Sequence, residues 1–488
     1  MDPQIEYARG VTRRHFLRNC QIGLGALALN TLSQSTPAAV KSTQPMAPKL
    51  PPLAAKAKHV IYLHMAGSPP QHELFDYKPE LVKHNLKPCS DEMLAVLQKE
   101  RLPFINLKQR RPKLLGTPYK FRRHGKSGTM VSELLPNVSK CVDEMAVIKS
   151  MHTDQFNHAP AQLYLYTGSP RSGGASMGSW VTYGLGSENQ NLPGFVALVS
   201  GGTDPSGGKS LWGSGFLPSV YQGVQCRTKG EPILYVTNPK GMDRKVRRRS
   251  LDALRELNEL EFEKLGDPET RARIEQYELA FRMQMAVPQV MDMSRETKQV
   301  QTAYGIEPGK ESFANNCLLA RRLVENGVRY VQLFDYGWDM HGTGKGNDLM
   351  TAMPRKCRDI DRPIGALLTD LKQRGLLEDT LVIWSGEFGR TSLNEERNGS
   401  KFLGRDHHPH CYSMWMAGGG VKGGTTYGAT DDLGYFVAEQ KMGVHDLQAT
   451  VLHLLGFDPH HFSVPYQGLK QRLIGPTDAG KVRHALLA

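Results

Sequence analysis

The sequence predicts an α/β protein whose doubly wound, mainly parallel sheet carries helices on both faces. Twice along the chain a helical pattern ends at a glycine and an apolar strand follows directly, which is typical of a helix-to-strand crossover. Because parallel sheets bind ligands beyond the carboxyl ends of their strands, polar residues just after these strands are candidate site residues. The two crossovers are residues 313–326, Gly327 and residues 328–334, then residues 360–374, Gly375 and residues 380–384.

Two further segments complete the predicted architecture. An apolar run at residues 59–64 predicts a buried strand, and Gly67-Ser68-Pro69-Pro70 predicts the turn after it. Residues 251 to about 285 are charged and strongly helical, with a break at Gly266-Asp267-Pro268. This pattern predicts two helices, which form a helical insertion over about residues 250–300.

The N-terminal residues predict an export signal. Thr12-Arg13-Arg14-His15-Phe16-Leu17 precedes a short apolar stretch at residues 22–29. The twin-arginine translocase recognises adjacent arginines, an aromatic residue and a leucine before a weakly apolar core, so we expect this translocase as a transient partner that binds Arg13 and Arg14. A basic tail before a buried helix is the alternative, and the position at the extreme N-terminus argues against it.

The export signal sets the predicted domain organisation and location. We expect residues 1–39 to be the signal peptide, residues 40–57 a linker, and residues 58–488 one domain that includes the helical insertion. The mature protein is then periplasmic or secreted. No segment has the roughly eighteen uninterrupted apolar residues of a transmembrane helix, so no transmembrane anchor is expected.

The chain is basic, with a formal net charge of +13 over 488 residues. Basic clusters at residues 110–111, 122–123 and 244–249 attract anions at long range, although a solvated basic surface is the simpler interpretation. No zinc finger, helix-turn-helix or RNA-binding aromatic motif accompanies them, so nucleic acid is not an expected partner. The cysteines beyond the leader form no C-x-x-C pair, and the sequence does not require disulfides.

Polar residues follow both crossover strands. Asp339 and His341 come after the first strand, and Glu387 and Arg390 come after the second. Asp339 and His341 are two residues apart, so in an extended segment they point the same way. That geometry suits them to hold one divalent ion.

A third polar cluster, at residues 404–410, precedes an apolar strand predicted at residues 412–417. It includes Asp406 and His407, and carboxylate with imidazole is a ligand set for zinc, manganese or iron. Such a metal can make a bound water nucleophilic near neutral pH. Any single histidine here is more often an exposed loop residue, but three such clusters at strand ends together favour a metal site.

Two common motifs lack the structural context that they require. Residues 418–423 fit G-x-G-x-x-G, but they open no predicted helix, which argues against dinucleotide binding. Residues 174–178 fit G-x-S-x-G, but no strand precedes them, which argues against a serine hydrolase.

Five segments carry a resemblance to a known family. They are residues 64–67 continuing through 75–79, residues 157–160, 337–341, 386–390 and 404–407. Together they resemble a large family of twin-arginine-exported, sulfatase-like bacterial proteins that is placed in the alkaline phosphatase-like superfamily. The likeness runs from about residue 58 to residue 475.

The resemblance implies a site for a divalent metal, with zinc, manganese or calcium as candidates. Members of that superfamily hold two metals with Asp and His residues and attack a phosphate or sulfate ester. By this likeness Asp339, His341 and His407 hold one metal, and Glu387 binds a second metal or acts as general base. Arg390 then holds an anionic oxygen of the substrate.

Three further residues are candidates under the same resemblance. His158 is expected to take part in catalysis, and Asp406 and His64 to contact substrate. His64 stands where the superfamily has an Asp, and the Ser that relatives often carry in the first turn corresponds to Pro70. With no formylglycine-type Cys-x-Pro-x-Arg signature and no evident nucleophile, we expect direct attack by a metal-bound water.

These residues predict an exported, metal-dependent hydrolase of phosphate or sulfate esters, with an anionic polysaccharide or another anionic polymer as the expected substrate. The missing nucleophile leaves an alternative open. In that alternative the chain is a catalytically inactive binding or scaffold protein that keeps the sulfatase-like fold.

Overall fold

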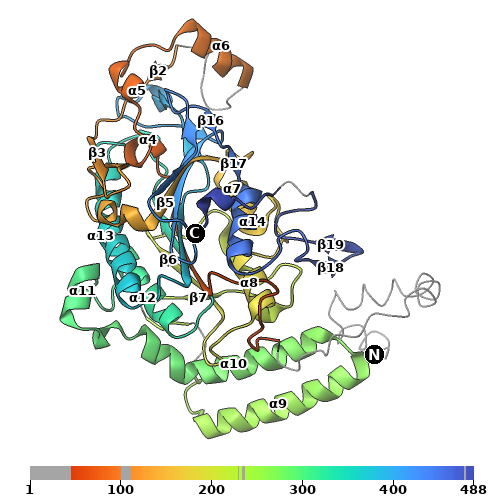
Figure 1. The fold of residues 1–488 in the computed structure, drawn as a ribbon. Coiled ribbons are helices and arrows are strands. Elements are labelled where there is room, and N and C mark those ends of the chain that lie inside the picture. The colour runs from red at the N-terminus through yellow and green to blue at the C-terminus, as the bar shows by residue number, and fades with distance from the viewer. Residues whose placement is uncertain (1–44, 101–110, 229, 234–236, 478–479) are drawn as a thin grey trace.

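The structure, a computed structural model, describes residues 45–100, 111–228, 230–233, 237–477 and 480–488 (Figure 1). The predicted signal peptide, with Arg13 and Arg14, lies outside these residues. A nine-stranded sheet forms the centre, and β17 (Met442–Gly443) also pairs with β5. Its main order is β14 (Thr425–Tyr427), β5 (Met145–His152), β13 (Tyr412–Ala417), β9 (Thr380–Ser385), β1 (His59–Ala66), β8 (Tyr330–Tyr336), β6 (Phe195–Ser200) and β7 (Val224–Cys226).

One strand of this sheet runs against the others. β13 is antiparallel to both of its neighbours, β5 and β9. The remaining described pairs in the sheet are parallel, including β1 with β8 and β1 with β9. The predicted doubly wound, mainly parallel fold class is therefore confirmed.

Helices cover both faces of the sheet. Strand side chains alternate between faces, so Ile61, Leu63 and Met65 pack into one core and Val60 and Tyr62 into the other. In Figure 1, the helices of the first core lie on one side of the sheet and those of the second core on the other. The first core has α12 (Phe313–Glu325) and α13 (Ala352–Gln373), and the second has α7 (His158–Thr167), α8 (Met177–Leu185) and α14 (Val444–Leu454).

The predicted insertion is a pair of helices, α9 (Arg244–Leu265) and α10 (Pro268–Met291). Gly266 ends α9 in the left-handed conformation with φ 63°, and the side chain of Asp267 accepts a hydrogen bond from the backbone N–H of Glu269. A left-handed glycine and an N-terminal Asp cap are common at helix ends, which is why the break could be predicted.

Shorter elements complete the described chain. Further short helices are α4 (Gln71–Leu74), α5 (Pro79–Lys83), α6 (Asp91–Glu100) and α11 (Lys298–Tyr304). The remaining strands are β2 (Lys113–Leu114), β3 (Phe121–His124), β4 (Thr129–Ser132), β10 (Gly389–Arg390), β11 (Leu393–Asn394), β12 (His407–His408), β15 (Ala429–Thr430), β16 (Val437–Glu439), β18 (Val464–Tyr466) and β19 (Leu469–Gln471).

The described residues can be compared with the predictions about membrane-spanning helices and disulfides. None of the described helices is long and apolar enough to cross a membrane. The six cysteines beyond the leader are all buried, and none of them forms a disulfide within the described residues.

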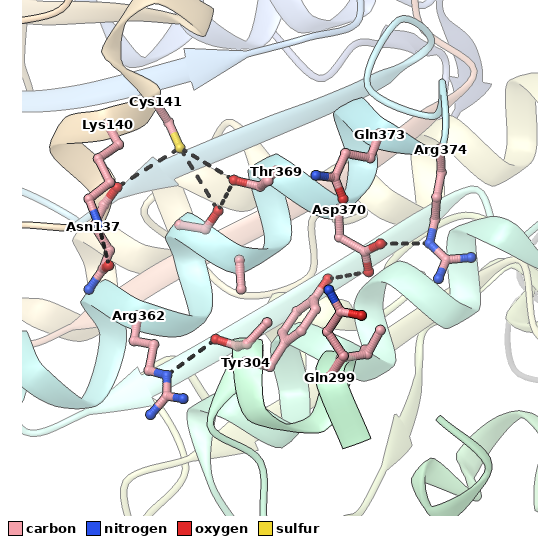
Figure 2. Close-up of a pocket in the computed structure, with 14 residues that line it drawn as sticks. Asn137, Lys140, Cys141, Gln299, Tyr304, Arg362, Thr369, Asp370, Gln373 and Arg374 are labelled. Carbon is pink, nitrogen blue, oxygen red and sulfur yellow. Dashed lines mark hydrogen bonds and ion pairs between the residues drawn. The ribbon is translucent and has the colours of Figure 1, made fainter. Parts of the chain in front are cut away.

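A cavity of about 790 Å³ lies between α11, α13 and the 3-10 turn Val138–Glu144 (Figure 2). In its wall the hydroxyl of Tyr304 donates to Asp370 at 3.0 Å, and Arg374 donates to the other oxygen of Asp370 at 2.7 Å. None of the site residues predicted from the sequence lines this cavity. The hydrolase hypothesis therefore concerns a different part of the molecule.

Burial of His72 predicts a loss of stability in mild acid. This ring on α4 is buried, and its Nε2 lies 3.1 Å from the carbonyl oxygen of Gly434. Burial, together with the nearby Arg405 and Lys78, holds the pKa of His72 well below its ordinary value. Since the unfolded chain then binds more protons below about pH 6.5, stability falls by up to about 1.4 kcal/mol per pH unit from this group.

The measurement is urea unfolding at several values between about pH 7.5 and pH 5.5. The His72→Gln variant is expected to show a shallower decline in the free energy of unfolding than the parent chain. His461→Gln, which changes an exposed histidine, serves as the control and keeps the parent slope. Equal slopes for all three proteins would contradict the assignment.

Candidate metal centre

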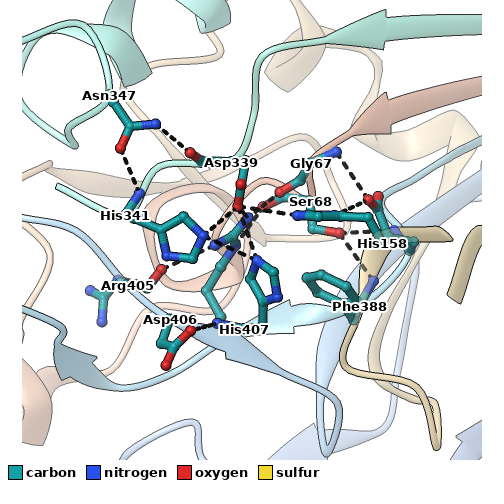
Figure 3. A network of polar contacts seen from close by, with 12 residues as sticks. Gly67, Ser68, His158, Asp339, His341, Asn347, Phe388, Arg405, Asp406 and His407 are labelled. Carbon is teal, nitrogen blue, oxygen red and sulfur yellow. Dashed lines mark hydrogen bonds and ion pairs between the residues drawn. The ribbon is translucent and has the colours of Figure 1, made fainter. Parts of the chain in front are cut away.

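The predicted polar segments meet at the carboxyl edge of the sheet (Figure 3). Gly67 follows β1, Asp339 follows β8 and Glu387 follows β9. Because β13 is antiparallel, the segment before it, with His407, arrives at the same edge. His158 joins them as the first residue of α7. The strand-end rule thus brings together segments that are distant in the chain.

Three imidazole rings point at one carboxylate oxygen (Figure 3). The Nε2 atoms of His341, His407 and His158 lie 2.8, 3.1 and 3.3 Å from Oδ1 of Asp339. Nε2 of His341 is also 3.1 Å from Nε2 of His407. Nε2 of His158 is buried, and apart from its 3.3 Å ionic contact with Asp339 it makes no hydrogen bond within the described residues, as expected of a donor atom aimed at a cation.

The opposite nitrogen of each ring is held by an oxygen acceptor. A neutral imidazole that donates its Nδ1 proton presents an unprotonated Nε2, which is the form that binds a metal. The three contacts from Nδ1 to oxygen are His341 to Glu395 at 2.6 Å, His158 to Glu387 at 2.6 Å, and His407 to the backbone oxygen of Phe156 at 2.8 Å. The guanidinium of Arg397 also lies 3.0 Å from Nδ1 of His341.

Glu387 is a fully buried support for His158. Its Oε1 also accepts hydrogen bonds from the backbone N–H of Gly67 at 3.0 Å and from Gln162 at 3.1 Å. Its Oε2 lies 3.3 Å from Nε2 of His64. Burial raises the pKa of Glu387, but the contacts from His158 and His64 outweigh it and hold the pKa well below its ordinary value.

The turn after β1, which contains Gly67 and Ser68, packs closely against the backbone next to Asp339. Gly67 has φ +103°, and a Cβ there would lie 2.6 Å from the backbone nitrogen of Asp339, so only glycine fits. Ser68 also has a positive φ, 61°, and is buried. Its Oγ accepts hydrogen bonds from the backbone N–H groups of Glu387 and Phe388 at 3.0 and 3.1 Å. These hydrogen bonds join the loop after β1 to the loop after β9.

Arg390 forms a buried ion pair with Asp339. Its guanidinium is fully buried and donates to Oδ1 of Asp339 at 2.6 Å, to the backbone oxygens of Ser68 and Arg405 at 3.1 Å each, and to that of Gly67. Burial raises the pKa of Asp339, but the charge of Arg390 and the three histidine contacts outweigh it and hold the pKa far below its ordinary value. Asp339 is therefore ionised.

Like Arg390, the other two residues predicted to contact substrate, His64 and Asp406, are buried. His64 ends up between the rings of Tyr166 and Phe334, with ring-centroid distances of 5.5 and 5.3 Å. Asp406 accepts a hydrogen bond from the backbone N–H of His407 at 2.8 Å. Burial and the nearby Glu395 raise the pKa of Asp406 to about 6. Both residues line the interior of the centre and not its opening.

Residues 57–487 match the family model described as protein of unknown function (DUF1501). The chain belongs to the DUF1501 family. No curated protein matches its sequence.

Solved structures similar to this DUF1501 protein include sulfatases and an alkaline phosphatase. The lipoteichoic acid synthase LtaP from Listeria monocytogenes has a TM-score of 0.34 at 12% identity, over 87% of this chain and 76% of LtaP. The PsFucS1 sulfatase from Pseudoalteromonas sp. scores 0.32 at 15% identity, over 72% and 68% of the two chains. A TAB5 alkaline phosphatase variant with Mg bound in its M3 site scores 0.31 at 12% identity, over 83% and 99%.

The candidate metal centre of this DUF1501 protein opens to solvent on one side. The side chain of Asp339 is 33% exposed and that of His158 is 18% exposed, whereas His341 and His407 are nearly buried. The ring of Phe388 packs at a tilt against His407 and His158, with ring-centroid distances of 4.6 and 5.0 Å. A ligand can therefore reach the centre past Asp339 and His158.

Proposed function

We propose that this protein is a metal-dependent hydrolase in which one divalent cation is held by Asp339, His158, His341 and His407. The observation that supports this proposal is the convergence of three Nε2 atoms on Oδ1 of Asp339, while each Nδ1 faces an acceptor. One carboxylate with three imidazoles suits zinc or manganese. Calcium prefers oxygen ligands and fits this set less well.

A cation in this centre would polarise an ester oxygen and lower the pKa of a bound water. The residues around it hold the ligands in place: Glu387 orients His158, and Glu395 orients His341. Arg390 keeps Asp339 ionised, so we assign it to positioning and not to the grip on substrate that the resemblance implied. A second metal on Glu387 is not part of the proposal, because both of its oxygens already face hydrogen-bond donors or His64.

Water is the proposed nucleophile. The hydroxyl of Ser68, in the turn after β1, is buried and accepts hydrogen bonds from the backbone N–H groups of Glu387 and Phe388. The six cysteines of the described chain are buried as well. Neither the Ser68 hydroxyl nor any of these cysteine thiols is exposed for attack on an ester, which favours direct hydrolysis over a covalent intermediate.

The proposed substrate is a phosphate or sulfate ester, carried by an anionic polysaccharide or another anionic polymer. A formal net charge of +13 supports attraction of such substrates at long range. The deciding experiment is elemental analysis of the purified protein, followed by hydrolysis of aryl phosphate and aryl sulfate with the metal found. Metal-free protein that binds an anionic polymer without hydrolysing esters would instead support the scaffold alternative.

Glu395→Gln is expected to lower the affinity for zinc or manganese by about 10- to 100-fold. The carboxylate of Glu395 lies 2.6 Å from Nδ1 of His341 and also pairs with Arg397, and an amide would hold the ring less firmly in the orientation that presents Nε2. Titration with a metal-sensitive dye measures the affinity. The matched control is Glu396→Gln, which alters the neighbouring carboxylate that pairs with Lys113. Equal affinity in the two variants would reject this role for Glu395.

Export is proposed on sequence grounds alone. Arg13 and Arg14 precede a short apolar stretch, and the mature protein would then act in the periplasm or outside the cell. The test is cell fractionation of a strain that expresses the full chain. Replacing both arginines by lysine should leave the protein in the cytoplasm, whereas normal secretion of that variant would contradict the proposal.

A further inference from the structure

The cavity between α11 and α13 lies apart from the candidate metal centre (Figure 2). Near the start of α13, Lys356 donates to the backbone oxygen of Tyr336, the last residue of β8, at 2.8 Å. The part of α13 that lines the cavity begins at Arg362 and extends to Gln373. At a rise of 1.5 Å per residue, this part lies about 9 to 26 Å farther along the helix axis than Lys356. A ligand in the cavity would therefore leave the metal centre free.

Cationic side chains outnumber carboxylates in the wall of this cavity. Asp370 is the one carboxylate among the described lining residues. Its Oδ1 accepts a hydrogen bond from Arg374 at 2.7 Å, and its Oδ2 accepts one from Tyr304 at 3.0 Å. Lys140 and Arg362 also line the cavity, and neither forms an ion pair within the described residues. Their two charges are therefore available to an anionic ligand.

Lys140 and Arg362 lie on one side of the cavity (Figure 2). Nζ of Lys140 donates to Oδ1 of Asn137 at 3.2 Å. Asn137 packs on Gly365, where an added Cβ would lie 3.0 Å from the Cβ of Asn137, and Arg362 is about one helical turn before Gly365. Nε of Arg362 donates to the backbone oxygen of Ala303 at 3.2 Å, which fixes the guanidinium at the end of α11. Its Nη1 makes no hydrogen bond within the described chain and can donate to a ligand.

The rest of the lining suits the hydroxyl groups and apolar ring faces of sugars. Gln299 and Gln373 are exposed, and their amides make no hydrogen bond among the described residues. An amide both donates and accepts hydrogen bonds, as a sugar hydroxyl does. Val300, Ala303 and Ala366 supply partly exposed apolar surface between these polar groups. The volume of about 790 Å³ is typical of a ligand pocket.

We propose that this cavity binds a segment of an anionic polysaccharide, with Lys140 and Arg362 holding sulfate or phosphate groups of the sugar chain. Hydrogen bonds from charged donors to such groups are stronger than those between neutral partners, and the glutamine amides would bind the sugar hydroxyls. The inference rests on the proposed function for the class of polymer and not for the metal centre. A polymer held in the cavity would raise the local concentration of its ester groups around the protein.

Binding of a fluorescent dextran sulfate oligosaccharide to the full chain tests the proposal. The protein is treated with EDTA, so that no cation at the metal centre holds the anion. The parent chain is expected to bind dextran sulfate or dextran phosphate at least about tenfold more tightly than uncharged dextran of the same length. The comparison of the two charged polymers shows which ester group the cavity prefers.

Variants of the lining separate binding in the cavity from general attraction to a basic protein. Lys140→Ala/Arg362→Gln should raise the dissociation constant for the charged polymer at least about tenfold, and Lys140→Ala alone about threefold. Because Lys140 is exposed, the single variant keeps the test valid if the double variant folds poorly. Ala366→Trp fills the cavity without a change of charge and should also weaken binding at least about tenfold. Lys372→Ala removes a charge from an exposed lysine of α13 outside the cavity and should keep the parent affinity.

The result also distinguishes this site from the proposed hydrolase activity. Equal affinity of the parent chain for charged and uncharged dextran, parent affinity in Ala366→Trp, or an equal loss in Lys372→Ala and the double variant would each overturn the cavity site. Aryl ester hydrolysis by metal-loaded Lys140→Ala should equal that of the parent chain, because a small ester does not need the cavity. If no ester is hydrolysed while polymer binding follows the expected pattern, the proposed function fails and the cavity site stands.

Discussion

Asp339→Ala is expected to lower the affinity for zinc or manganese by more than about 100-fold and to abolish ester hydrolysis. Oδ1 of Asp339 is the point on which Nε2 of His158, His341 and His407 converge, so its loss removes the only anionic group of the proposed ligand set. Metal content after dialysis and the rate of aryl ester hydrolysis are the two measurements.

Asp339→Ala also leaves Arg390 buried without its partner, and the free energy of unfolding should fall by about 3–5 kcal/mol. His341→Ala separates the two effects, because it removes a proposed ligand while keeping the pair of Arg390 with Asp339. This second variant should lose metal with a smaller loss of stability. Asp458→Ala, at a surface Asp that pairs with His461, is the control. Full metal content in both centre variants would refute the assigned ligand set.

The strand-end rule predicted much of the candidate site from the sequence. Asp339 and His341 follow β8, and Glu387 and Arg390 follow β9, so the rule places these four residues at one edge. His407 precedes β13 and reaches the same edge because β13 is antiparallel, a direction that the sequence did not predict. Strand boundaries were predicted within about two residues, since apolar β-branched runs end at clear turn signals. The first helix turns of α13 were missed, because this helix begins at Ala352 and not near residue 360.

The sequence pattern did not identify the residues that support the proposed metal ligands, because tertiary contacts bring them to the centre. Glu395, Gln162 and the backbone oxygen of Phe156 stand on loops or helices whose approach to the centre follows from packing, and no local pattern marks them. For Arg390, the sequence predicted the position of the residue but not its role. The family resemblance implied that it holds an anionic oxygen of the substrate, but its contacts with backbone oxygens and with Asp339 make it a buried support for Asp339.

Glu73→Gln is expected to lower the free energy of unfolding by about 3–5 kcal/mol. Glu73 on α4 and Arg405 are both fully buried and form a two-point ion pair, with N–O distances of 2.6 and 3.0 Å. Arg405 also donates to the backbone oxygens of Thr391 and Leu115 at 3.0 and 2.9 Å. Removal of the carboxylate charge would leave the guanidinium charge buried and uncompensated.

Urea unfolding of Glu73→Gln and of the double variant Glu73→Leu/Arg405→Met distinguishes a buried charge from lost packing. The double variant should recover most of the stability, because no unpaired charge remains. Lys310→Ala, which breaks an exposed pair with Glu307, should change stability by less than about 1 kcal/mol. A loss below about 1 kcal/mol in Glu73→Gln would contradict the argument.

The same ion pair should also influence the metal centre. The backbone oxygen of Arg405 accepts a hydrogen bond from Arg390 at 3.1 Å, and Arg390 holds Asp339. A shift of Arg405 in Glu73→Gln would therefore loosen the support of the proposed ligand set, and metal affinity should fall by about tenfold at temperatures where the variant is folded. Unchanged affinity in that folded variant would show that the pair stabilises the loop after β1 without positioning Asp339.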